Sequence, residues 1–148
     1  MNGQALNGDE AEDLRCLAGM IVPPSTRYNV PGADDAAIQA DIVRSIGRDG
    51  AHVRSALARL RTLAGGAFAA LEEGQRVEAA QALRAERRRD VAVLTRIVLL
   101  CYYRDDRVML SLGMEPRPPF PQGHQLEQGD WSLLDQVRAR APFWRRVP

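Results

Sequence analysis

The chain has 148 residues, the size of a single domain, and its 45% hydrophobic and 26% charged residues are ordinary for a soluble globular protein. Its 20 basic and 19 acidic side chains nearly balance, which argues against a dedicated nucleic-acid-binding protein. The longest apolar run, Val91 to Cys101, is interrupted by Thr95 and Arg96 and is too short to span a bilayer, so no direct membrane insertion is expected.

The spacing of apolar residues predicts an all-α fold, a small bundle of about five helices. The five predicted helices run from a cap at Asn7 or Asp9 to Pro23, from Ala33 to Ile46, from a cap at Asp49 to Gly65, from Glu72 to Arg84, and from Glu86 to Tyr103. The fifth has apolar residues on more than one side, so we expect it at the centre of the bundle. Asp105 is predicted to cap one or two further turns, which Gly113 closes.

The segment after Gly113 combines helix-breaking residues with large aromatic ones. Its prolines are Pro116, Pro118, Pro119, Pro121, Pro142 and Pro148, and its aromatic residues are Phe120, Trp131, Phe143 and Trp144. Because proline lacks a backbone donor and fixes φ, no helix is expected through residues 116–121. A helical turn or two is predicted from Ser132 to Val137. Structureless segments longer than roughly 12–15 residues are uncommon in compact domains and need a functional reason.

Ordering such a segment costs roughly 1–2 kcal/mol per residue, whereas burying its aromatic side chains returns roughly 15–25 kcal/mol gross. The aromatic side chains alone therefore do not order it. We expect a helical bundle at residues 1–113 and an extended, Pro-rich C-terminal arm at residues 114–148 that packs on a partner protein. The alternative is that the arm wraps around its own helices.

The sequence offers little chemistry of its own. Cys16 and Cys101 are far apart and match no zinc, redox or haem pattern, so two buried free thiols are expected. His52 and His124 lack spaced ligand partners, and Gly65-Gly66 ends a helix instead of opening one after a strand. We therefore predict no catalytic, cofactor-binding or metal-binding residue, and no enzyme activity for this chain by itself.

Charged residues cluster at two places. The run Arg84, Arg87, Arg88 and Arg89 is interrupted by Glu86 and is interpreted as a solvated or interface helix end in preference to a phosphate-binding patch. The segment from Arg104 to Arg107 follows two tyrosines, and we interpret Asp105 first as a helix cap and second as an anchor where the arm departs. The residues predicted to contact a partner are Tyr102, Tyr103, Arg107, Phe120, Trp131, Phe143 and Trp144.

Two groups of motifs stand out by their order and spacing. One group is Leu17-Ala-Gly-Met-Ile-Val-Pro-Pro24 followed by Val30-Pro-Gly-Ala33 and an apolar helix. The other is Tyr102-Tyr103, Asp105-Asp-Arg-Val108 and Leu112-Gly113, followed by a Pro/Gly-rich C-terminus. Together these motifs resemble the gluconate 2-dehydrogenase subunit 3 family, and the resemblance extends from about Leu14 to Phe120.

The resemblance implies a small helical subunit without a cofactor. Members of that family pair with a large FAD-containing flavoprotein of the glucose–methanol–choline oxidoreductase type, which oxidises a sugar, polyol or other alcohol, and some complexes add a cytochrome. The implied function is a non-catalytic subunit that keeps the flavoprotein folded and assembled; the alternative is a transient assembly or export chaperone. A stand-alone DNA-binding regulator is a third hypothesis, which rests only on the arginines from Arg84 to Arg89.

The resemblance also bears on location. Many relatives carry a twin-arginine export signal, and the polar, acidic stretch from Met1 to Glu12 has neither that motif nor an apolar secretory segment. We therefore expect a cytoplasmic protein. Transport with a signal-bearing partner would place it in the periplasm instead.

Overall fold

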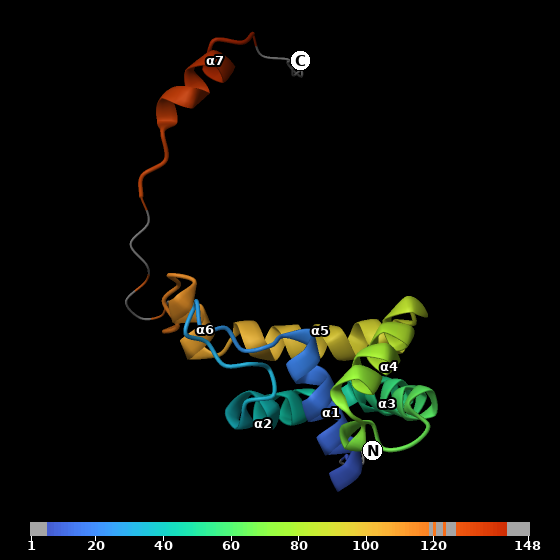
Figure 1. The fold of residues 1–148 in the computed structure, drawn as a ribbon. Coiled ribbons are helices and arrows are strands. Elements are labelled where there is room, and N and C mark those ends of the chain that lie inside the picture. Colours follow the sequence, from blue (N-terminus) through green and yellow to red (C-terminus); the bar gives the residue numbers. More distant parts are fainter. Residues whose placement is uncertain (1–5, 119, 121–122, 124–126, 142–148) are drawn as a thin grey trace. The chain divides into compact units, whose positions relative to one another are not determined.

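The computed structural model describes residues 6–118, 120, 123 and 127–141, which belong to two compact units, Met1–Pro116 and Arg117–Pro148. The described residues contain helices and no strand, which confirms the all-α prediction (Figure 1). The α-helices are α1 (Gly8–Ile21), α2 (Ala36–Ser45), α3 (Gly50–Ala64), α4 (Glu73–Ala85), α5 (Arg89–Tyr103), α6 (Asp106–Ser111) and α7 (Asp135–Arg138). Short 3₁₀ helices are η1 (Gly47–Asp49), η2 (Phe68–Ala70) and η3 (Trp131–Leu134).

Several helix ends follow directly from their cap residues. Of the two candidate caps for α1, the structure selects Asn7, whose Oδ1 accepts a 2.8 Å hydrogen bond from Glu10 N while Asn7 N donates to Glu10 Oε2 at 2.9 Å. Gly65 ends α3 in the left-handed region at φ 69°, where glycine carries no Cβ penalty. Asp105 caps α6 as predicted, by accepting a hydrogen bond from Arg107 N.

Two predicted helix starts and one predicted side-chain cap differ from the structure. The second helix begins at Ala36 instead of Ala33, because the Asp35 carboxylate accepts hydrogen bonds from the first-turn amides and ends the preceding loop there. The fifth begins at Arg89 instead of Glu86, because Arg87 adopts a positive φ of 49° that no helix contains. Asp49 does not cap α3 through its side chain, which instead accepts a 2.7 Å ion-paired hydrogen bond from Arg96 on α5.

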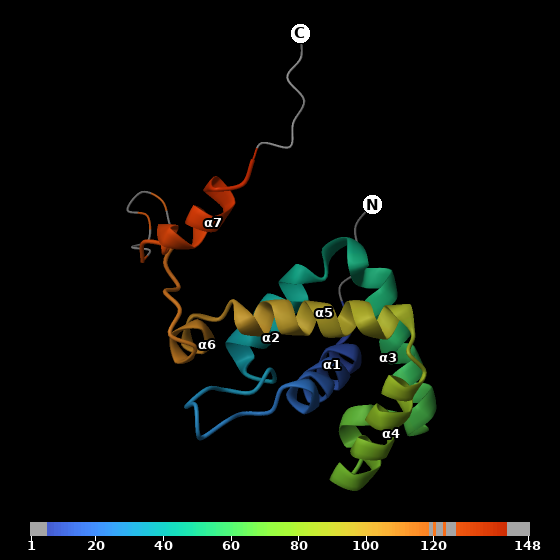
Figure 2. The same ribbon diagram turned by 90° about the horizontal axis from the view of Figure 1, so that it is seen from above.

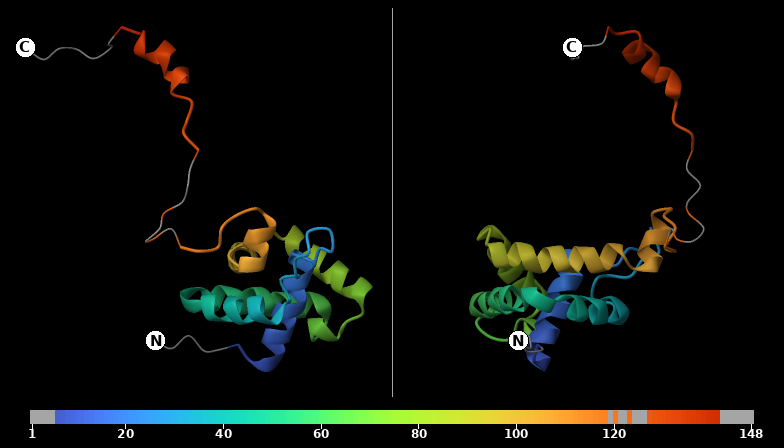
Figure 3. Two further views of the ribbon diagram at one scale, coloured as in Figure 1. Left: turned by 90° about the vertical axis from the view of Figure 1, so that its left-hand side faces the viewer. Right: turned by 180° about the vertical axis from the view of Figure 1, so that it is seen from behind.

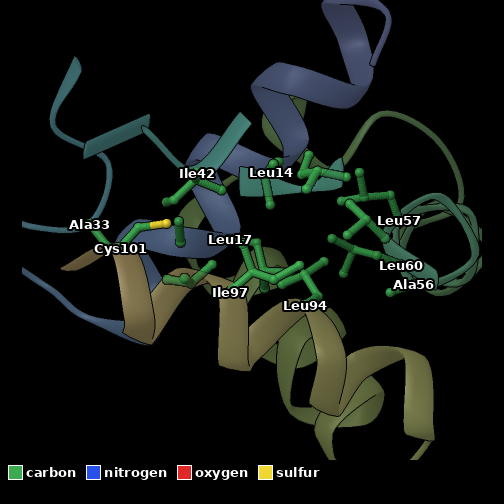
Figure 4. Packing of buried hydrophobic residues seen from close by; sticks show 14 of the residues in the cluster. Leu14, Leu17, Ala33, Ile42, Ala56, Leu57, Leu60, Leu94, Ile97 and Cys101 are labelled. Atoms are coloured by element: carbon green, nitrogen blue, oxygen red, sulfur yellow. The ribbon is translucent and has the colours of Figure 1, made fainter. Parts of the chain in front are cut away.

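The core of the Met1–Pro116 unit lies where α1, α2 and α3 meet α5. Figure 4 shows side chains from all four helices pointing toward one another, among them Leu14, Ile42, Leu57 and Leu94. Phe68 from η2 is fully buried and belongs to the same cluster. Cys101 is buried as expected, whereas Cys16 is only partly buried, and both are free thiols.

One buried carboxylate links three segments of this core. Asp13 on α1 is 1% exposed, accepts a 2.5 Å hydrogen bond from Arg61 Nε on α3, and accepts a 2.9 Å hydrogen bond from Ala69 N in η2. Since a buried charge is stable only when it is paired and hydrogen-bonded, this arrangement fixes α1 against α3 and η2.

Helix α5 has a different environment from the one predicted. It packs against α1, α2, α3 and α6 along one side, as Figures 1 and 2 show for its long course across the other helices. Its opposite side is open: Leu100 and Tyr103 are exposed. The helix is therefore the one on which α1, α2 and α3 converge, but the apolar residues on its second side form an uncovered face.

Helix α4 leaves the start of α5 at a wide angle, which Figure 3 shows from two further directions. It packs mainly against α3, with Ala79 and Leu83 as its buried residues. Side chains of α1, α4 and α5 line a hollow beside the junction of α4 and α5.

The Arg117–Pro148 unit has local order in its described residues. Asp130 accepts hydrogen bonds from Ser132 N at 3.1 Å and Ser132 Oγ at 2.6 Å and begins η3, which continues into α7. These turns agree with the helical segment predicted from Ser132 to Val137. Neither η3 nor α7 contains a buried residue.

Candidate partner-binding surface

The two adjacent tyrosines at the end of α5 have different environments. Tyr102 is 4% exposed, its hydroxyl donates a 3.2 Å hydrogen bond to Pro31 O, and burial raises the pKa of its phenol. Tyr103 is 53% exposed and its ring meets Tyr102 edge to face, with centroids 5.3 Å apart. Tyr102 is thus a core residue that supports the exposed ring, and of the pair only Tyr103 is available for direct contact.

Arg107 on α6 is held by two carboxylates of its own chain. Its guanidinium donates to Asp35 at 2.8 and 3.2 Å and to Asp105 at 2.9 and 3.0 Å. This guanidinium lowers the pKa of both carboxyl groups, which also cap α2 and α6. Arg107 therefore joins the starts of two helices, and most of its donors are already used.

The predicted aromatic contacts in the arm are exposed where they are described. Phe120 is 86% exposed and Trp131 is 62% exposed. Phe143 and Trp144 lie outside the described residues. Tyr102, Tyr103 and Arg107 thus all belong to the Met1–Pro116 unit, where only the two tyrosine rings are in contact, while Phe120 and Trp131 belong to the other unit.

Besides Tyr103, exposed apolar residues that were not predicted lie on α5 and at α6. Leu100 precedes Tyr103 by one turn on α5, and Leu110, Leu112 and Met114 follow at and after α6. The sequence signal for Leu100 was the second apolar side of the fifth helix, which was assigned to the core. The signal for the α6 residues was weak, because a short helix with few neighbours gives no clear periodicity.

The open side of α5 forms a shallow groove of about 900 Å³, which we call the α5 groove. Its apolar lining comes from Val91, Ala92, Leu99, Leu100 and Tyr103. A second hollow of about 530 Å³ lies among α1, α4 and α5, is lined by Met20, Val77 and Ala80, and shares Val91 and Thr95 with the first. The two hollows therefore form one continuous apolar surface.

Arginines supply all the charge on this surface. The α5 groove is lined by Arg84, Arg87, Arg88, Arg96 and Arg104, and no acidic side chain is among the described residues that line it. Three of the five are paired with carboxylates from outside the groove: Arg88 with Asp90 at 2.7 Å, Arg96 with Asp49 at 2.7 Å and Arg104 with Asp41 at 2.5 Å. For Arg84 and Arg87 no ion pair is recorded within the described part of the chain.

The ion pair between Asp90 and Arg88 lies at the arginine-rich end of the α5 groove. Asp90 is buried in the first turn of α5, where Arg88, the Ser55 hydroxyl and the Val91 amide all donate to its carboxylate. These donors, Arg88 foremost, outweigh desolvation and hold the pKa of Asp90 well below its usual range. The carboxylate therefore stays ionised and fixes Arg88 beside the groove.

The described residues contain no group of three or more His, Cys, Asp or Glu side chains that could hold a metal ion. Among the same residues, none of the helices has the length and apolar character needed to cross a bilayer. Among the described residues, the open side of α5 is lined by apolar side chains along the helix and by five arginines. Comparison of the chain with models of known protein families, with curated proteins and with solved structures found no match.

Proposed function

We propose that the chain is a non-catalytic small subunit that binds and stabilises a large FAD-dependent oxidoreductase of the glucose–methanol–choline type acting on a sugar, polyol or other alcohol. The flavin and the catalytic groups belong to the large subunit in this proposal. The choice of partner rests on the resemblance of the Leu17–Pro24 and Tyr102–Gly113 motifs to the gluconate 2-dehydrogenase subunit 3 family. A cytochrome that receives electrons through the large subunit is part of the same proposal.

The observation that carries a binding function is the α5 groove, which ends at the exposed Tyr103 of the second motif. Aromatic residues and arginine are the types most enriched at the energetic centres of protein interfaces. Covering the exposed half of one tyrosine, ~100 Å² at ~25 cal/mol/Å², returns about 2.5 kcal/mol, close to a hundredfold in affinity. A surface of this kind on a helical unit is typical of a subunit that is covered in its working state.

Co-expression with a large flavoprotein of the glucose–methanol–choline type from the same genome tests the proposal. We expect one size-exclusion peak that contains both chains in fixed ratio with bound flavin. Tyr103→Ala should weaken the complex by about 2 kcal/mol, or thirtyfold in dissociation constant, because it removes a central aromatic contact. Tyr28→Ala is the matched control, since Tyr28 is a similarly exposed tyrosine in the loop before α2.

Two results would speak against a permanent subunit. Separate elution of the two chains under all conditions would contradict the proposal. Binding to the flavin-free large chain, followed by release when FAD is added, would identify a transient assembly chaperone in its place.

A further inference from the structure

We propose that the α5 groove receives an amphipathic helix of the partner protein whose apolar face covers Leu99, Leu100 and Tyr103 and whose carboxylates pair with Arg84 and Arg87. The proposal depends on the previous section only for the identity of the partner. It adds the chemistry of the contact: a helical segment, apolar on one side and acidic beside it.

The shape of the surface favours a helix. The groove follows α5, a helix of 15 residues, and its apolar lining recurs along one side of that helix. Helix-in-groove recognition uses apolar anchors three, four and seven residues apart, which such a stripe accommodates. The adjoining hollow among α1, α4 and α5 widens the groove at the end where Val91 and Thr95 lie.

The charge of the surface favours an acidic partner. Covering Arg84 and Arg87 with apolar or basic groups would leave two guanidinium groups poorly solvated without a counter-ion, a cost of several kcal/mol per buried charge. Carboxylates can instead accept paired hydrogen bonds from each guanidinium. The neighbouring Arg88 and Arg96 already pair with carboxylates of this chain. Additional carboxylates from a partner are therefore needed only at the end of the groove near the start of α5.

A second copy of the chain is a poor occupant of the same surface. In a twofold contact the groove would face an identical groove, whose described lining contains no acidic residue to pair with Arg84 and Arg87 and adds two further arginines without an ion pair there. Like charges brought together in this way cost binding energy and direct the surface toward a different partner.

Two synthetic helical peptides of about 15 residues, the length of α5, test the proposal on the full-length chain. Both carry the same Leu and Trp face, and one has Glu and the other Lys at the remaining positions. We expect the Glu peptide to bind at least about tenfold more tightly at low salt, measured by fluorescence anisotropy, with the difference shrinking as salt is added.

Variants then locate the site. The double variant Arg84→Glu/Arg87→Glu should reverse the preference between the two peptides, and Leu100→Glu should weaken the Glu peptide at least tenfold. Arg27→Glu/Arg48→Glu is the matched control, because both arginines are exposed and neither lines the groove. Circular dichroism of each variant verifies that the helices persist.

Three results would overturn the proposal: equal binding of both peptides, no binding of either, or an equal effect of the control variant. Self-association of the chain that Leu100→Glu abolishes would show that a second copy covers the groove, and would overturn it as well. Failure of the proposed function is distinguishable. If the flavoprotein complex forms but is affected neither by the Glu peptide nor by Arg84→Glu/Arg87→Glu, only this inference is overturned. If the chain selects the Glu peptide but forms no flavoprotein complex, only the proposed function is overturned.

Discussion

At the scale of single residues, Asp13 is a buried carboxylate on which two other segments of the core depend. Its carboxylate is 1% exposed and satisfies both Arg61 Nε and the Ala69 amide. Asp13→Ala leaves those two donors without an acceptor, and because Arg61 retains some solvent access we expect the free energy of unfolding to fall by about 2–3 kcal/mol. Urea denaturation measures this change.

Asp9 supplies the control for that experiment. It lies 3.9 Å from the same Arg61 guanidinium but its side chain is 82% exposed. Because exposed ion pairs contribute little to the stability of a fold, Asp9→Ala should change the free energy of unfolding by less than about 0.5 kcal/mol. If both substitutions lowered the free energy of unfolding by a similar amount, burial would not be the reason that Asp13 contributes to stability.

Asp90 makes the stability of the fold depend on acid pH. Its pKa in the folded chain lies well below that of an unfolded aspartate, because Arg88, Ser55 and the Val91 amide donate to it. A lowered folded pKa contributes stability that is complete above the unfolded pKa, near 4, and is lost as pH falls through the folded pKa. We expect the melting temperature to fall between about pH 5 and pH 2, and Asp90→Asn to lower it at pH 7 and flatten this decline. An unchanged acid limb in Asp90→Asn would assign the effect to other carboxylates.

At the scale of elements, the sequence predicts the five long helices, because apolar spacing and cap residues agree along the chain. The errors lie at helix starts, where a single side chain decides. Asp35 was placed inside the second helix and instead caps it, and Asp49 was assigned a cap and instead pairs with Arg96 across to α5. A sequence shows that a carboxylate stands near a helix start, but a partner distant in the chain, such as Arg96, appears only after folding.

The junction of α4 and α5 gives a prediction at this scale. Arg87 has φ 49°, in the left-handed region where a non-glycine residue costs roughly 1 kcal/mol. Arg87→Gly removes that cost and should raise the free energy of unfolding by about 0.5–1 kcal/mol, measured in urea. Arg84→Gly, in the last turn of α4 where the backbone is still helical, should lower it by about 0.5–1 kcal/mol, because glycine weakens a helix. A loss of stability in both variants would show that the arginine side chain, and not its backbone, matters at residue 87.

At the scale of the whole molecule, the candidate surface was predictable only in part. Tyr103 stood out beside a charged turn, and the structure leaves it exposed. Tyr102 next to it was assigned the same role, although adjacent residues on a helix face different directions and this one is buried. The α5 groove was not predicted. The sequence pattern of an apolar helix side is the same whether that side is covered by a helix of the same chain or by another protein.

The division of the chain gives the last prediction. Every buried hydrophobic residue among the described residues lies between Leu14 and Val108, and the Met1–Pro116 unit contains all of them. A chain ending at Pro116 should therefore keep its helical circular dichroism signal and unfold cooperatively, within about 4 °C of the full-length protein, a shift that corresponds to less than about 1 kcal/mol. Loss of cooperative unfolding would show that residues after Pro116 belong to the core. The truncated chain is expected to bind the proposed large subunit at least about tenfold more weakly. That result would indicate that the exposed Phe120 and Trp131 contact the partner. The entropy cost of ordering the arm would then be offset by the contacts made on binding.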